Sequence, residues 1–262
     1  MKNSALIEPG NEYEAWLREF DQREIDASDA RSMWALRYRS RLGRVLGALG
    51  DLPPGATVLE VGCSQANASL LAAERGLRAV GLDRDVRALA YARRKHEQGD
   101  LAVVCGQAEA LPLADGSCDA VLATEILEHL PDPAAALWEM RRVLKPGGRL
   151  VVTTPNADFI HERLPSYAEH APGATASPQA DAAGHLFAFT LAELRALIRG
   201  VGFTVRAAGY EGSVLMADRL RLNRLLPPVA TQGLSRLTNR LPGGRRLSYA
   251  CVVVAARTDA PG

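Results

Sequence analysis

The sequence predicts an α/β fold in which helices cover both faces of a mostly parallel sheet. The first observation is residues 57–83, where two short apolar runs enclose a small-residue turn and a helical segment. The second is the chain beyond this stretch, where strand-like and helical segments continue to alternate. Because successive parallel strands need a crossover connection, this alternation favours a parallel sheet over a series of hairpins.

Residues 57–83 read as a strand, a turn, a helix and a second strand. The apolar run at 58–61 stops at Gly62, and small residues follow, so a backbone can approach a ligand closely there. A helical segment at 68–75 precedes a second buried run that ends in Asp83. A unit of this kind binds a nucleotide beyond the strand ends, with an acid about 20 residues on holding the ribose hydroxyls.

The later elements follow the same alternation. Helices are expected at 86–98 and 133–143, and strands at 101–105, 117–123, 150–154, 203–209 and 248–256. A further helix is expected after Thr190, which has Glu193 three residues on and so forms a capping box. Two amphipathic helices are expected within residues 1–50; their aromatic stripe either packs on the sheet or reaches a substrate.

Composition sets limits on function. The 262 residues are 47% hydrophobic and 23% charged, as in globular proteins, and the net charge of +1 gives no reason to expect a nucleic-acid partner. No apolar run has membrane-spanning length and none resembles a leader, which predicts a cytoplasmic protein. Four widely spaced cysteines are expected to be free thiols, and no metal site is expected.

The turn after the first strand argues against a dinucleotide. A dinucleotide fingerprint needs glycine at positions 62, 64 and 67, and only Gly62 is present. Glu60 lies two residues before that turn, where a carboxylate would repel a pyrophosphate but would suit a ligand with a cationic amine.

Five motifs, in order, resemble those of class I S-adenosylmethionine (SAM) dependent methyltransferases. Residues 60–66 are similar to the motif acid-x-Gly-x-Gly-x-Gly, with Ser64 and Ala66 in place of glycine, and Asp83 matches the acid of the second strand. Residues 106–112 resemble the adenine-side motif, residues 124–130 the segment x-E-x-x-E-H-[LV], and residues 145–148 the Lys-Pro-Gly-Gly turn.

This resemblance implies a Rossmann-like sheet of seven strands with the last one antiparallel. It also implies SAM as cofactor, with S-adenosylhomocysteine as product. By position, the implied cofactor-binding residues are Glu60, Gly62, Cys63, Ser64, Asp83, Arg84, Gln107, Ala108, Glu109, Thr124 and Glu125. His185 is the first candidate for a general base and His129 the second; the alternative roles are a histidine that holds a lid in place and one that anchors a helix start.

The expected organisation is an N-terminal helical cap at 1–50, a methyltransferase domain at 51–257 and a tail at 258–262. The domain carries a lid loop at 155–184 and a basic amphipathic insertion at 211–246. The part of this insertion at 215–246 interleaves arginine with leucine. It either contacts an anionic membrane surface or packs as helices over the active-site mouth.

Three functions are consistent with the sequence. The first is methyl transfer from SAM to a small-molecule acceptor, at an oxygen nucleophile, by in-line displacement. The second is methylation of a lipid-linked or membrane-associated acceptor, and the third is a non-catalytic SAM-binding regulatory role. The sequence names neither the acceptor nor an oligomeric state.

Overall fold

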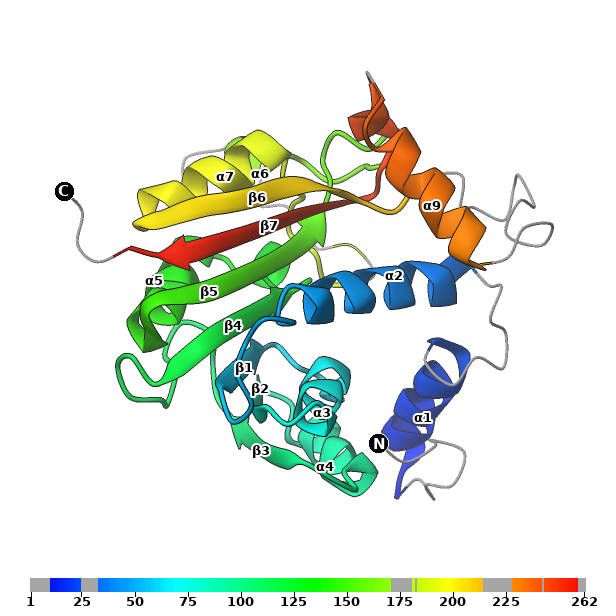
Figure 1. The fold of residues 1–262 in the computed structure, drawn as a ribbon. Helices are drawn as coiled ribbons and strands as arrows, with labels where there is room; N and C mark the ends of the chain where they lie inside the picture. Colours follow the sequence, from blue (N-terminus) through cyan, green and yellow to red (C-terminus); the bar gives the residue numbers. More distant parts are fainter. Residues whose placement is uncertain are drawn as a thin grey trace.

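A seven-stranded sheet organises the molecule, with the strands in the order β3-β2-β1-β4-β5-β7-β6 (Figure 1). The computed structural model describes residues 10–24, 33–170, 181, 183–213, 228–241 and 243–258. The strands are β1 (Thr57–Val61), β2 (Arg78–Asp83), β3 (Asp100–Cys105), β4 (Cys118–Thr124), β5 (Leu144–Pro155), β6 (Phe203–Glu211) and β7 (Ala250–Arg257). The first five strands are parallel and β7 is antiparallel to both neighbours, which confirms the predicted Rossmann-like fold.

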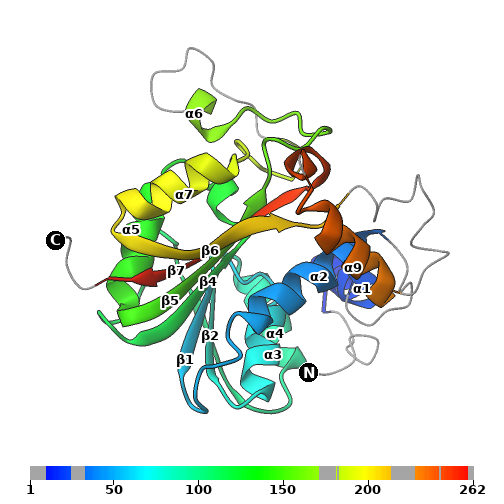
Figure 2. The ribbon, with the colours of Figure 1, turned by 45° about the horizontal axis from the view of Figure 1, so that its top comes forward.

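Helices cover both faces of this sheet (Figures 1 and 2). They are α1 (Glu12–Glu24), α2 (Met33–Gly47), α3 (Asn67–Glu74), α4 (Val86–Lys95), α5 (Pro133–Val143), α6 (Tyr167–His170), α7 (Leu191–Gly200) and α9 (Pro228–Thr238), with short 3-10 turns η2 (Leu127–His129) and η5 (Gly244–Leu247). The α2, α3 and α4 helices lie on one face, and α5 and α7 lie on the other.

Side chains on the two faces of the central strand β1 pack in two separate hydrophobic cores. Leu59 and Val61 pack in the core that α5 and α7 cover, whereas Val58 packs in the core under α2 and α3. This alternation follows from the two-residue period of a strand, and both faces are apolar because both are buried. Glu60 therefore points to the α3 side, a placement that matters for the site below.

The helix starts follow the sequence closely. Thr190 and Glu193 form the predicted capping box at α7, with the Glu193 carboxylate accepting from the Thr190 backbone N–H at 2.8 Å. Asp132 caps α5 by accepting from Ala135 N–H at 3.1 Å, and Pro133 occupies the first turn. These caps satisfy N–H groups that the helix itself leaves without partners.

A buried ion pair holds α1 against the rest of the fold. Lys95 Nζ, near the end of α4, lies 2.7 Å from Asp21 Oδ2 in α1, and both side chains are almost fully buried. Asn67 at the start of α3 joins the pair, accepting from Lys95 and donating to Asp21 at 2.9 Å. The two helices predicted within residues 1–50 are thus present, and α1 is fixed beside α3 and α4.

The fifth strand begins earlier than predicted. Leu144 already pairs with Cys118, and the strand runs on past a register shift, so residues 145–148 lie within β5 and not in a separate turn. Lys145 contacts the Asp119 carboxylate at 2.8 Å, and the same carboxylate accepts from Thr57 N–H at 2.8 Å. Asp119 thereby has a structural role, joining the starts of β1 and β5.

The basic insertion is described only in part. Residues 228–241 contain α9, while Arg219, Arg221 and Arg224 lie outside the described residues. The β7 strand starts at Ala250, two residues later than predicted, because η5 occupies the chain just before it. Among the described residues, no helix has the length and apolar character needed to cross a membrane.

Candidate functional site

A cavity of about 660 Å³ opens at the carboxyl ends of β1, β2 and β4. This is the edge at which doubly wound sheets bind their ligands. Its lining includes nine of the residues predicted from the sequence: Gly62, Ser64, Asp83, Arg84, Gln107, Ala108, Glu109, Glu125 and His129. The other predicted residues, Glu60, Cys63, Thr124 and His185, are not part of the lining.

The turn after β1 keeps the glycine-type backbone although two glycines are missing. Gly62 has φ of 70°, and a Cβ there would lie 2.7 Å from the Ile126 side chain, so glycine is required. Ser64 (φ 48°) and Ala66 (φ 57°) also adopt the left-handed conformation, which costs an L-residue roughly 1–2 kcal/mol. Among the described non-glycine residues, only these two and Glu125 have positive φ; Ser64 and Glu125 line the cavity, and Ala66 is buried beneath the turn.

Asp83 joins this turn to the end of β2. Its Oδ2 accepts from Ser64 N–H at 2.7 Å, and its Oδ1 accepts from Asp85 N–H at 2.9 Å. Each oxygen retains a further lone pair, and the side chain lines the cavity, so a ligand diol can be bound there. Asp83 therefore fixes the loop as well as facing the ligand space.

Glu60 acts on the helix that follows the turn. Its Oε2 accepts from Ser69 N–H at 2.8 Å and from Ser69 Oγ at 2.6 Å, so the carboxylate points into the first turns of α3. Burial raises the pKa of the Glu60 carboxyl to about 7. Glu60 thus anchors the first turn of α3, while its predicted roles toward the loop and the amino end of the cofactor stay predictions.

Two more predicted cofactor residues, Cys63 and Thr124, are not part of the cavity lining. Cys63 is only 5% exposed, and its backbone N–H donates to Leu82 O at 2.9 Å. Thr124 is the last residue of β4, where its backbone pairs with Thr153 of β5. Both residues hold the strand ends in register, which places their neighbours Ser64 and Glu125 in the cavity.

The segment after β3 closes the opposite wall from the turn. Gln107 pairs with Ala110 in an isolated bridge, and Glu139 from α5 accepts from Leu111 N–H at 2.8 Å. Those contacts hold Gln107, Ala108 and Glu109 against the cavity. An amide and a carboxylate at this position can bind hydrogen-bond donors of a base or an amine.

Glu125 and His129 line a second wall of the cavity, named here the acceptor-side wall. Glu125 has a backbone φ of 52°, its Oε1 accepts from Thr153 Oγ1 at 3.0 Å, and its Oε2 lies 3.1 Å from Arg41 Nη1 of α2. The salt bridge brings α2 to the cavity rim. No sequence signal pointed to Arg41, because its position 84 residues before Glu125 follows only from the folded topology.

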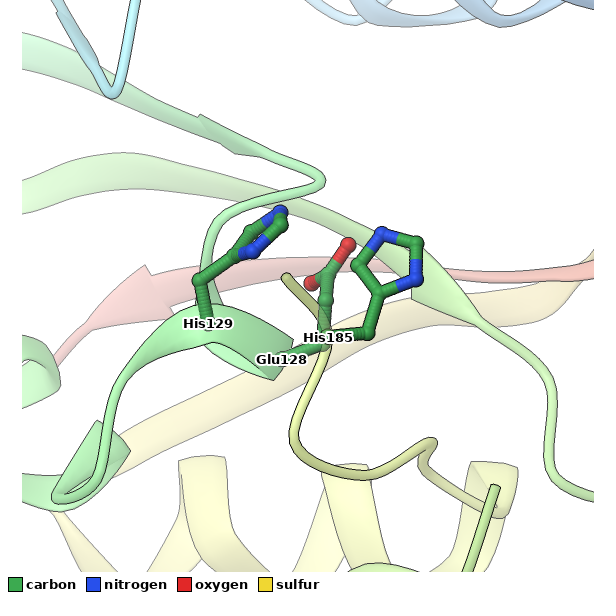
Figure 3. Close-up of side chains that lie close together, drawn as sticks. All are labelled: Glu128, His129 and His185. Atoms are coloured by element: carbon green, nitrogen blue, oxygen red, sulfur yellow. The ribbon is translucent and has the colours of Figure 1, made fainter. Parts of the chain in front are cut away.

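Glu128, His129 and His185 lie close together, and His129 is the one of the three that lines the cavity (Figure 3). The two imidazole rings have centroids 4.7 Å apart. His129 Nδ1 lies 3.0 Å from Gly184 O, and His185 Nδ1 lies 2.9 Å from Asp181 Oδ2. Burial lowers the pKa of His129, and burial raises that of Glu128 well above its usual value.

The two predicted catalytic histidines therefore come together, and which of them acts as a base stays a prediction. His129 lines the cavity, whereas His185 contacts the His129 ring and follows Ala183 and Gly184, which do line it. His185 also begins the segment that leads through the buried Phe187 to α7. Its contacts place His185 beside the predicted site, while its role as a general base stays a prediction.

Tyr13, Trp16 and Trp34 are the aromatic residues of the N-terminal helices for which the sequence left open packing on the sheet or contact with a substrate. Tyr13 of α1 lines the cavity beside Asp83 and Arg84. Burial, together with a hydrogen bond to Asp85, raises the pKa of its phenol to about 12. Of the other aromatic side chains in that stripe, Trp16 is 56% exposed, and the Trp34 side chain lies outside the described residues.

The cavity fits the cofactor that the resemblance implies. A glycine that no other residue can replace allows close backbone approach at Gly62, and Asp83 offers acceptor positions for a diol. Carboxylates at Asp83, Glu109 and Glu125 outnumber Arg84 around the lining, which suits a ligand with a sulfonium and an ammonium group. SAM carries a ribose diol, a sulfonium group and an ammonium group.

Comparison with known proteins supports the same assignment. Residues 59–152 match the family model described as a methyltransferase domain. The chain is 35% identical over 161 residues to a demethylmenaquinone methyltransferase of Renibacterium salmoninarum, covering 62% of this chain and 64% of that protein. It is 38% identical over 105 residues to a ubiquinone biosynthesis O-methyltransferase of Pseudomonas paraeruginosa, covering 39% and 45%.

A solved structure agrees at the level of the fold. The S-adenosylmethionine dependent methyltransferase from Mesorhizobium loti matches with a TM-score of 0.62 at 18% identity, covering 85% of this chain and 98% of that one. The chain spans 36%, 56% and 64% of the lengths of three curated relatives, so it corresponds to part of each. These matches agree with the methyltransferase resemblance that the five motifs carry.

Proposed function

We propose that this chain, a member of the class I SAM-dependent methyltransferase family, transfers the methyl group of SAM to a hydroxyl oxygen of a small-molecule acceptor. SAM supplies, when bound, a methyl group on a sulfonium that is already a good leaving group. The chain then has two tasks, which are to align the acceptor oxygen and to help remove its proton. Alignment of two bound reactants supplies up to ~7–11 kcal/mol in favourable systems.

The observation that carries this proposal is the histidine pair at the acceptor-side wall. Because His129 Nδ1–H donates to Gly184 O, the lone pair of the neutral ring is on Nε2. The lowered pKa of His129 keeps this ring neutral near pH 7. His185, which pairs with the Asp181 carboxylate, has the arrangement that orients a histidine for proton transfer.

A phenolic or hydroquinone hydroxyl is the acceptor class that we favour. Two of the similar proteins are named for reactions of menaquinone and ubiquinone biosynthesis, and the second is named an O-methyltransferase. A phenol has a pKa near 10, so its oxygen is a weak nucleophile at pH 7 until its proton is removed. Help from a histidine is worth ~10²–10⁴-fold for such a proton.

Methyl transfer from isotopically labelled SAM to a panel of hydroquinones, catechols and simple phenols tests this proposal. We expect turnover with at least one class, and we expect His185→Ala to reduce turnover far more than SAM affinity measured by calorimetry. His96→Ala is the matched control, because His96 lies at the exposed end of α4, where it contacts Gly99 O. Bound SAM without turnover on any acceptor would instead support a non-catalytic SAM-binding protein.

A further inference from the structure

We propose that Glu128, His129 and His185 form a binding site for a divalent transition-metal ion, with Zn²⁺ as the favoured occupant. No metal site is expected from the sequence. Metal binding stands on geometry alone, whereas its use in catalysis rests on the proposed methyl transfer.

The three side chains present a compact set of ligand atoms. One ligand atom from each lies within 4.8 Å of the others, and the Glu128 carboxylate projects between the two rings (Figure 3). Ligands of a tetrahedral zinc with ~2.0–2.1 Å bonds stand roughly 3.3 Å apart, so binding draws the two imidazoles inward by a small movement. Two imidazoles and one carboxylate suit zinc and its neighbours better than Mg²⁺ or Ca²⁺.

Each histidine is already oriented as a metal ligand. His129 Nδ1 is bonded to the Gly184 carbonyl, and His185 Nδ1 is bonded to the Asp181 carboxylate, so both Nε2 atoms carry a free lone pair. Metal-bound histidines almost always make such a contact through their second nitrogen, to a carbonyl or a carboxylate. Both kinds of partner occur here, one for each ring.

Glu128 provides an independent observation. Its side chain is fully buried; Oε2 accepts from Thr154 Oγ1 at 3.0 Å, but Oε1 is buried without a hydrogen-bond partner among the described residues. A buried carboxylate oxygen ordinarily has a donor or a cation beside it. Arg41, the nearby cation, lies 3.1 Å from Glu125 and forms its ion pair there.

The position of the site indicates what an ion would do. Three protein ligands leave at least one coordination position open, as in catalytic zinc sites, and His129 places that position beside the cavity. With the ion bound, both Nε2 lone pairs would be used as ligands, so the ion and not a histidine would promote proton loss: an acceptor hydroxyl bound to it would release its proton to solvent more easily. Its oxygen would then form the new bond to the methyl carbon while the carbon–sulfur bond breaks, leaving the electron pair on sulfur.

The test uses the full chain, free of any affinity tag containing histidine and stripped with a chelator. Titration with Co²⁺, followed by visible absorption, and then displacement by Zn²⁺ should show one site per chain. His185→Ala and Glu128→Ala should weaken binding at least 100-fold, and Asp181→Asn about 10–100-fold, as expected for a partner of a ligand. His96→Ala should bind as the wild type does.

Zn²⁺ should also raise the melting temperature of the wild type and not that of His185→Ala, which keeps the test valid if a variant is less stable. Equal Co²⁺ affinity in wild type and His185→Ala, or no binding to the wild type, would overturn the metal site. Full turnover in chelator would overturn its catalytic use while leaving the proposed methyl transfer, with His129 as base. Metal binding without methyl transfer to any acceptor would support the metal site and contradict the proposed function.

Discussion

The two ends of the cavity are built in different ways. At the cofactor end, the Ser64 N–H and the Asp83 carboxylate meet across two adjacent strands, 19 residues apart in the chain. At the acceptor end, His129 bonds to Gly184, 55 residues away, and Glu125 pairs with Arg41, 84 residues before it. A short βαβ unit makes the first end, whereas loops and a helix from distant parts of the chain make the second.

The largest expected effect comes from breaking the cofactor end at Asp83. Asp83→Ala removes two hydrogen bonds to backbone N–H groups and the acceptor positions for the ligand. Hydrogen bonds to a charged group are worth ~1.5–3 kcal/mol each, so we expect SAM affinity by calorimetry to fall at least 100-fold. Asp100→Ala is the matched control, because Asp100 makes only an exposed ion pair with Arg78.

Retention of near wild-type SAM affinity in Asp83→Ala would contradict the cofactor site. The structure also predicts a loss of stability in this variant, since the loop after β1 loses its anchor. Thermal unfolding in the presence and absence of SAM separates the two effects, because only the wild type should gain stability from the ligand.

The next effect concerns α1, which covers the cofactor end through Tyr13. Lys95→Met leaves Asp21 as a buried charge that has lost its counterion, although the amide of Asn67 still donates to it. Removing one partner of a buried pair costs ~3–5 kcal/mol, which denaturant unfolding would measure. Arg78→Met, in an exposed pair, should cost no more than ~1 kcal/mol.

A second substitution sharpens this result. If the cost comes from the uncompensated charge, Lys95→Met with Asp21→Asn should recover a large part of the lost stability. No recovery would show that packing of the lysine stem, and not its charge, holds α1 in place. SAM binding should weaken in parallel with the loss of α1, because Tyr13 lines the cavity.

The sequence predicted the cofactor end because its signals are local. Strand period, the turn after Val61 and the acid at Asp83 all lie within one βαβ unit, and the structure confirms the elements there. The capping box at Thr190 and the helix at Pro133–Val143 were predictable for the same reason. The caps of these two helices join residues that are three positions apart in the chain.

The acceptor end could be predicted only in part. The motif at 124–130 pointed to His129, and the segment at His185 pointed to a second histidine, but their contact depends on the path of the chain between them. Nothing local indicates that Lys95 is buried against Asp21, 74 residues away. Such pairs follow from topology, which a single sequence does not specify residue by residue.

The pH dependence of stability tests the buried acid behind the cofactor loop. The folded-state pKa of Glu60, about 7, lies above its usual value of 4.5, so the folded protein keeps a proton that the unfolded chain releases. The resulting stability is fully present below pH 4.5 and is lost as the pH rises through 7. At ~1.36 kcal/mol for each pKa unit, the loss is at most about 3 kcal/mol.

Glu60→Gln should remove this dependence, because glutamine resembles the protonated acid and can still accept from Ser69 N–H. We expect the unfolding free energy of the wild type to fall relative to Glu60→Gln between pH 5 and 8. All other titrating groups are common to both proteins, so the difference isolates Glu60. Parallel pH profiles would mean that the carboxylate is not held in its protonated form.

The smallest expected effect lies in the turn itself and compares its two unusual residues. Ser64→Gly and Ala66→Gly both remove a left-handed L-residue, at φ of 48° and 57°. Ser64 is half-buried, and within the described part of the chain its hydroxyl bonds only to Gln65 at 2.6 Å, so glycine there should stabilise the protein by about 0.5–1 kcal/mol. Ala66 is fully buried, and loss of its methyl group costs about 0.8 kcal/mol, which should cancel the gain.

Denaturant unfolding of the two variants therefore separates backbone strain from packing. SAM affinity should change little in Ser64→Gly, since the backbone N–H that bonds to Asp83 remains. Equal destabilisation by both variants would show that the left-handed turn stores no strain. A gain in stability at Ser64 without one at Ala66 would show how the turn keeps its shape without its glycines. The left-handed conformation of Ser64 would then be an uncompensated cost in stability, whereas burial of the Ala66 methyl group would offset the same cost at that position.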